Sequence, residues 1–135
     1  MSKSTIYTAN TSAQNVAVNG TINLGNVIRR FGQCLQLSGN AIQIEGPGYY
    51  DIDASITLAP TAAGNVVVTA YKDGVIIPGA TATTSTSTAN NPVNLSISSL
   101  VRKFCPCAEG IENLTFVLTG TPASVTNIAV VVEKL

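Results

Sequence analysis

Residues 46–58 read Gly-Pro-Gly-Tyr-Tyr-Asp-Ile-Asp-Ala-Ser-Ile-Thr-Leu, and this stretch decides the fold class. After the Gly46-Pro47-Gly48 break, apolar and polar residues alternate, which is the period of a β-strand with one buried face. Such a strand must bury its apolar face against a second layer. The predicted inner face carries Tyr50, Ile52, Ala54, Ile56 and Leu58, and the predicted outer face carries Tyr49, Asp51, Asp53, Ser55 and Thr57.

Short alternating runs continue on both sides of this strand, with turn signals about every 8–12 residues and no long helical periodicity. The Asn19-Gly20 pair predicts a tight hairpin over residues 15–24, and Lys72-Asp73-Gly74 predicts a second hairpin. Residues 26–33 fit either a loop or one helical turn, Pro78-Gly79 predicts a break, and residues 80–91 permit a strand at their start. Further strands are expected at 5–9, 34–37, 41–45, 65–71, 75–77, 93–104, 113–119 and 126–134.

This pattern predicts an all-β chain, folded as an antiparallel two-sheet β-sandwich or jelly roll rather than as βαβ units. No internal repeat, linker or composition shift divides the 135 residues, so we expect a single domain over 1–135. Within it, residues 1–33 would supply N-terminal strands or an attachment segment.

The composition excludes several classes of function. The chain has 7 Lys+Arg, 7 Asp+Glu and no His, so it lacks both a basic patch for nucleic acid and the His of a catalytic triad. There is no run of 18 apolar residues and no apolar leader at the N-terminus, so we expect neither membrane insertion nor a classical secretory signal. We therefore predict no enzyme activity, no catalytic residues and no cofactor.

The last predicted strand is apolar on both faces, since residues 128–132 read Ile-Ala-Val-Val-Val. An antiparallel strand in a two-layer sandwich should alternate, because one of its faces meets water. The second face is then covered by another subunit or by a loop of the same chain. A charged fraction of only 10% favours another subunit, because permanent interfaces are poor in charge.

Three cysteines, Cys34, Cys105 and Cys107, are weak candidates for metal ligands of a soft kind. A structural zinc site needs four ligands, and the chain has neither a His nor a fourth Cys. Free buried thiols, a disulfide from Cys34 to one of the other two, and a metal site all remain open, and free thiols are the favoured reading.

The charged side chains suggest pairing rather than catalysis. Asp51 and Asp53 share one strand face, where an ion pair or a solvated face is the favoured reading over a calcium or acid–base pair. The doublets Arg29-Arg30 and Arg102-Lys103 are candidates to hold a carboxylate, a sugar acid or an acidic patch of a partner, and a solvated or inter-subunit ion pair is the favoured interpretation.

The segment from Gly46 to Leu58 resembles a signature of the tumour necrosis factor/complement globular-head (TNF-like) superfamily, in which a Gly-x-Tyr element opens a long central strand. Residues 66–77 resemble the next hairpin of that family, and residues 127–135 its C-terminal strand. The similarity covers residues 36–135 and is greatest to bacterial and phage members. The chain lacks a collagen-like stalk, and Cys105-Pro106-Cys107 is not part of the family pattern.

The resemblance implies a TNF-like jelly roll that forms a homotrimer, with the trimer interface made by Tyr49, Asp51, Asp53, Arg102, Ala129 and Val131. Pairing of Asp51 or Asp53 with Arg102 across subunits is expected. Because we expect neither a secretory signal nor a stalk, we favour a non-enzymatic structural or binding module on a virion surface: a phage head decoration, a head fibre or a receptor-binding tip. Its partners would be other virion proteins and a host-surface glycan or protein. The alternative is a spore-surface or secreted bacterial TNF-like trimerisation or adhesion domain, located on the spore or cell surface.

Overall fold

A computed structural model describes residues 3–103 and 111–135, which form twelve strands. The strands are β1 (Thr5–Asn10), β2 (Gln14–Val16), β3 (Gly20–Thr21), β4 (Asn26–Phe31), β5 (Leu35–Ser38), β6 (Ala41–Ile44), β7 (Gly48–Pro60), β8 (Gly64–Lys72), β9 (Val75–Thr86), β10 (Val93–Lys103), β11 (Glu112–Gly120) and β12 (Ala123–Lys134). None of these residues belongs to a helix long and apolar enough to cross a membrane.

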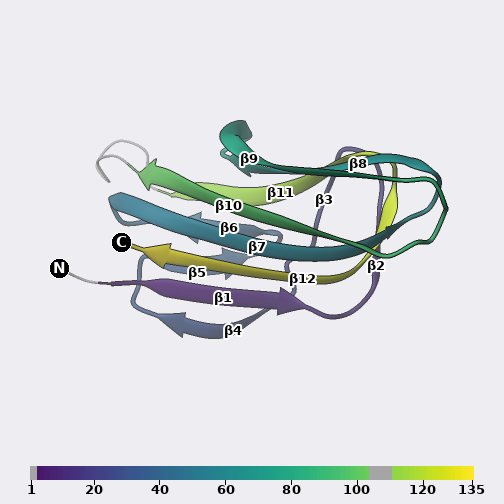
Figure 1. The fold of residues 1–135 in the computed structure, drawn as a ribbon. Helices are drawn as coiled ribbons and strands as arrows, with labels where there is room; N and C mark the ends of the chain where they lie inside the picture. The colour runs from purple at the N-terminus through teal and green to yellow at the C-terminus, as the bar shows by residue number, and fades with distance from the viewer. Residues whose placement is uncertain (1–2, 104–110) are drawn as a thin grey trace.

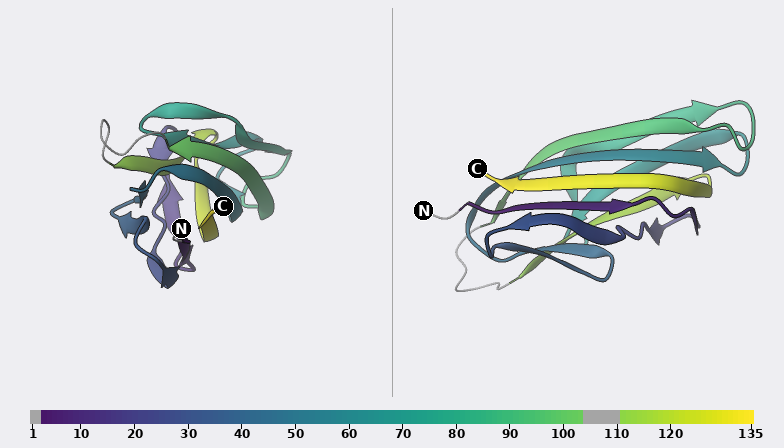
Figure 2. Two further views of the ribbon diagram at one scale, coloured as in Figure 1. Left: turned by 90° about the vertical axis from the view of Figure 1, so that its left-hand side faces the viewer. Right: turned by 90° about the horizontal axis from the view of Figure 1, so that it is seen from below.

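The strands form two antiparallel sheets that pack face to face (Figures 1 and 2). The first sheet has the order β10-β7-β12-β1-β4, with β2 paired to β12. The second sheet has the order β5-β6-β11-β8-β9, with β3 paired to β11. Apart from the hairpins β5–β6 and β8–β9, consecutive strands do not pair with each other, and most lie in different sheets. The chain therefore wraps around the sandwich as a jelly roll. This confirms the predicted fold class.

The core lies between the sheets and consists almost entirely of aliphatic side chains. The predicted alternation on β7 is confirmed, since Tyr50, Ile52, Ile56 and Leu58 are fully buried. The Tyr50 hydroxyl donates a hydrogen bond to the Gly46 carbonyl oxygen at 2.7 Å, so this buried polar group is satisfied. Its burial raises the pKa of the Tyr50 hydroxyl above its ordinary value.

The predicted hairpin over residues 15–24 is wrong. A turn is present, with the Gly20 N–H donating to the Ala17 carbonyl oxygen at 2.9 Å. Only Asn19, its third residue, has a positive φ (68°), which is the pattern of a type II turn. Type II turns splay the flanking strands, whereas hairpins need the opposite twist. The two strands therefore separate: β2 pairs with β12 in the first sheet, and β3 pairs with β11 in the second.

Two further segments differ from the simplest interpretation of the sequence. Residues 26–31, which fitted a loop or a helical turn, form β4 at the edge of the first sheet. Strand β9 continues through Pro78 instead of ending there. Its pairing with β8 shifts register opposite Thr69–Tyr71, so the proline and Gly79 sit in an irregularity where the ladder needs no donor.

Candidate subunit interface

The six residues predicted for the trimer interface come together on one surface, the outer face of the first sheet. Strand β7 lies between β10 and β12, and directly opposite residues share a face. Asp53 stands opposite Val131 and Ser98, and Tyr49 stands opposite Arg102. This surface, called the sheet face below, carries Tyr49, Asp51, Asp53, Arg102, Ala129 and Val131.

The centre of the sheet face is nearly flat and is made of small side chains. Ala129 and Val131 are half-buried and border a shallow depression of about 340 Å³. The Ser98 hydroxyl donates to Asp53 Oδ1 at 3.0 Å, and the Asn94 amide donates to Thr57 Oγ1 at 3.0 Å. These bonds hold the polar side chains along the sheet, which leaves a smooth surface that another molecule can approach closely.

Acidic groups meet at one end of the sheet face. Asp51 stands opposite Glu133 in the neighbouring strand and shares one strand face with Asp53. Partial burial raises the pKa of the Asp51 carboxyl, and the negative charges of Asp53 and Glu133 raise it further. Like charges directly opposite one another weaken a sheet, so this end favours a partner that supplies positive charge or a proton.

Arg102 is the cationic residue among the six that define the sheet face. Its guanidinium lies over the ring of Tyr49, 5.5 Å from the ring centroid, a cation–π contact within one chain. The doublet containing it does not act as a unit. Lys103 points to the other side of β10 and is only 2% exposed, so it takes no part in the sheet face. Arg29 and Arg30 diverge in the same way, because Arg30 Nε donates to the Leu35 carbonyl oxygen at 2.6 Å.

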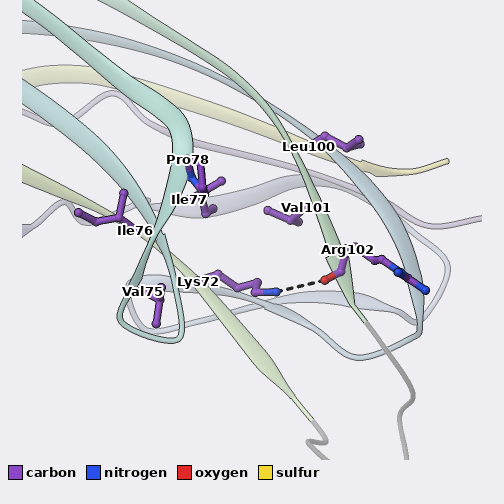
Figure 3. Close-up of a pocket in the computed structure, with 8 residues that line it drawn as sticks. All are labelled: Lys72, Val75, Ile76, Ile77, Pro78, Leu100, Val101 and Arg102. Carbon is purple, nitrogen blue, oxygen red and sulfur yellow. Dashed lines mark hydrogen bonds between the residues drawn. The ribbon is translucent and has the colours of Figure 1, made fainter.

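A groove of about 370 Å³ runs along the edge where β9 of the second sheet meets β10 of the first (Figure 3). Val75, Ile76 and Leu100 are 68%, 53% and 52% exposed, which is a concentration of accessible apolar surface. The groove, called the edge groove below, is lined by Lys72, Val75, Ile76, Ile77, Pro78, Leu100, Val101 and Arg102.

Lys72 fixes the floor of the edge groove by joining the two sheets. Its ammonium donates to the Arg102 carbonyl oxygen at 3.1 Å (Figure 3). The same ammonium lies 3.6 Å from Glu112 Oε1. Sequence reasoning missed the groove, because it forms only when β9 and β10 from opposite sheets come together. The run of three aliphatic residues at 75–77, directly after an exposed turn, is the signal that could have indicated it.

The structure describes one of the three cysteines, Cys34. Cys34 is a free, half-buried thiol whose Sγ lies 3.9 Å from Lys134 Nζ. Cys105 and Cys107 lie outside the described residues. Among the residues that the structure describes, no three His, Cys, Asp or Glu side chains are close enough together to hold a metal ion.

The architecture has counterparts among solved structures. Murine APRIL superposes with a TM-score of 0.72 at 10% identity, covering 99% of this chain and 100% of that one. Eiger TNF from S. frugiperda gives 0.69 at 10% identity, covering 98% and 91%. The vertex protein P5 of PRD1 gives 0.64 at 15% identity, covering 98% and 96%. No protein-family model and no curated protein matches the sequence.

These likenesses extend over almost the whole of each chain, so they concern the complete sandwich and not one motif. The two-sheet jelly roll described above is the class of fold that they share. In particular, it is the TNF-like jelly roll, as the Gly-x-Tyr element at the start of β7 predicted. Identities of 10–15% establish the fold, and function must be argued from the surfaces.

Proposed function

We propose that the chain is a non-enzymatic binding module that assembles as a homotrimer, in which the edge groove of each subunit packs on the sheet face of the next. The two surfaces differ in shape, so the contact between them is head-to-tail. A head-to-tail contact forms a ring when its rotation closes. The observation that carries the proposal is the pairing of an exposed apolar edge with a flat, weakly charged face in one small chain.

The energetics favour covering both surfaces. Exposed aliphatic surface gains roughly 25 cal/mol for each Å² removed from water. Val75, Ile76 and Leu100 are each more than half exposed in the single chain, so they have area left to bury. The sheet face offers Ala129 and Val131 at its centre, where their small side chains permit close approach. In the trimer, Arg102 at the end of the groove would meet the acidic group of the neighbouring subunit.

We place this trimer on a virion surface, as a phage head decoration, head fibre or receptor-binding tip. The shared fold with the PRD1 vertex protein P5 supports this placement. The geometry of the two ends also supports it. Both termini lie at one end of the sandwich (Figure 1), and the loops after β7, β9 and β11 gather at the opposite end. One end is then available for attachment and the other for binding.

The loops at the binding end are tied into one unit. The Thr61 N–H and hydroxyl both donate to the Pro122 carbonyl oxygen, at 2.9 and 3.0 Å. The Asn90 N–H donates to the Pro60 carbonyl oxygen at 2.7 Å. Hydroxyl and amide side chains dominate these loops, and such groups suit a host-surface glycan or a polar protein surface.

Photo-crosslinking tests the subunit contact. A benzophenone amino acid at Ile76 should give covalent products of two and three chains, with the crosslinks mapping to peptides of β7 and β12. The same group at Val18, which is 43% exposed in the turn before β3, is the control and should give none. Crosslinks from Ile76 confined to its own chain would refute the contact.

Antibody labelling tests the placement. Gold-labelled antibody against the chain should decorate purified phage particles from the source of the sequence. Labelling confined to spores or cell walls would reject the virion role and leave the trimer to be judged by the crosslinks.

A further inference from the structure

Strand β4 is an exposed edge. It pairs with β1 along one side and ends the first sheet (Figures 1 and 2). Within residues 3–103 and 111–135, no backbone hydrogen bond is made on its other side. All six of its residues are exposed. An edge of this kind presents a row of free N–H and C=O groups that can pair with another strand.

The exposed side chains of β4 include large apolar groups. Phe31, Ile28 and Val27 are 67%, 53% and 40% exposed. Strands β7, β12 and β1 lie between β4 and the edge groove, and β1 lies between β4 and the part of the sheet face on β12. The free edge of β4 therefore belongs to neither surface of the proposed trimer contact. The edge therefore has both main-chain and side-chain surface available outside the trimer.

Strand β4 is also held firmly in place. Gly25 and Gly32 border it with positive φ values of 82° and 81°. A Cβ on Gly25 would overlap the Ala9 carbonyl oxygen, and one on Gly32 would overlap the Lys3 carbonyl oxygen, so both ends of β4 pack tightly against the N-terminal segment of the same chain. A pre-ordered edge loses little conformational entropy on binding, which favours an extended ligand.

The charged residues in the sequence around β4 all have one sign. Residues 1–44 contain Lys3, Arg29 and Arg30 and no Asp or Glu, whereas residues 45–135 contain all seven acidic residues of the chain. Arg29 stands opposite Tyr7 on the outward side of β4 and makes no hydrogen bond or ion pair among the described residues. Strands β1 and β4 therefore carry no carboxylate, and the nearest one in the row through Phe31 and Thr5 is Glu133 on β12.

We propose that β4 is a strand-addition site for an extended acidic segment of a partner protein, which would add to the first sheet beside β4. Main-chain hydrogen bonds would supply affinity, and Arg29 with the apolar side chains would supply selection. A second copy of β4 fits less well. Antiparallel self-pairing places the Arg29-Arg30 doublets of the two copies opposite or diagonal to each other, and like charges across a ladder are unfavourable.

A peptide tests the site on the intact protein. The probe is acetyl-Glu-Thr-Val-Glu-Val-Thr-Glu-amide, with a Lys-for-Glu version as the charge control. We expect the acidic peptide to bind and to slow amide hydrogen exchange in β4, with no change in the mass of the protein assembly beyond the added peptide. Methylating alternate backbone nitrogens of the peptide on its pairing side should weaken binding about tenfold or more, because about three main-chain hydrogen bonds are lost.

A matched pair of protein variants tests the role of charge. Arg29→Gln should weaken binding of the acidic peptide about two- to fivefold, the range for an exposed ion pair. Ser87→Glu, an exposed position at the binding end, changes net charge by the same amount and should have no effect. Equal binding of the acidic and Lys-containing peptides, protection outside β4, or no binding of either peptide would overturn the proposal. Protection of β4 without peptide, together with doubled mass, would show that a second copy occupies the edge and would also overturn it.

Discussion

Replacing Leu100 by alanine should weaken the trimer without unfolding the subunit. Leu100 lies in the edge groove and is 52% exposed in the single chain, so about half of its surface remains to be buried by a neighbour. Complete burial of a leucine side chain is worth roughly 1.5–3 kcal/mol, so this half is worth about 0.8–1.5 kcal/mol at each subunit contact. Three equivalent contacts make the loss about 2.5–4.5 kcal/mol for the trimer.

This loss is large enough to measure by sedimentation across a dilution series. The chain concentration at half-dissociation of a trimer varies as the square root of the dissociation constant, so it should rise about 10- to 50-fold in Leu100→Ala. Val18→Ala is the control, because Val18 is 43% exposed but lies in neither surface. Thermal unfolding of the dissociated subunit should change little. Half-dissociation concentrations of Leu100→Ala and Val18→Ala that agree within about twofold would refute the reasoning, given the magnitude above.

Three other perturbations give separate tests. At neutral pH, Asp51→Asn should raise the melting temperature, because a carboxyl with a raised pKa opposes folding while it is charged. The gain in melting temperature should shrink as the pH falls toward the ordinary Asp pKa of 3.8. A gain that does not depend on pH would contradict this origin. Gly25→Ala should lower thermal stability more than Gly74→Ala. Both glycines have φ near 80°, but a Cβ at Gly25 would overlap the Ala9 carbonyl oxygen, whereas one at Gly74 would meet no atom within 4 Å. Equal losses of stability would argue against close packing of β4 on β1. Lys103→Met should raise the free energy of unfolding, measured by chemical denaturation, by about 1–3 kcal/mol. The reason is that the buried Lys103 ammonium has no hydrogen-bond partner among the described residues. A lower free energy of unfolding would show that the charge is compensated.

The part of the fold carried by local pattern was predictable. Alternation along β7 correctly separated Tyr50 and Ile52, which are buried, from Tyr49 and Asp53, which face outward. Residues 128–132 are apolar on both faces, so the outer position of Ala129 and Val131 on β12 was expected from the resemblance to the TNF-like C-terminal strand and not from alternation. Period-2 patterns are robust because a one-residue slip would move every apolar side chain to the wrong face.

The features that depend on pairing between distant segments were not predictable. Asn19-Gly20 is a strong hairpin signal, but the strands on its two sides do not pair with each other. Strand β2 pairs with β12 in the first sheet, and β3 pairs with β11 in the second. The alternation at 26–31 is broken by a register shift, so β4 is defined only by its contact with β1. The edge groove forms where Leu100 of β10 and Ile76 of β9 come together from opposite sheets. Their spacing in the sequence does not predict this contact.

The mass of the assembly in solution tests the central claim most directly. Light scattering on the chain at micromolar concentration should give about 42 kDa, three times the 13.9 kDa of one chain, since the edge groove and the sheet face would both be covered only in a closed ring. A mass of 13.9 kDa under those conditions would contradict the account, because both surfaces would then remain exposed to water.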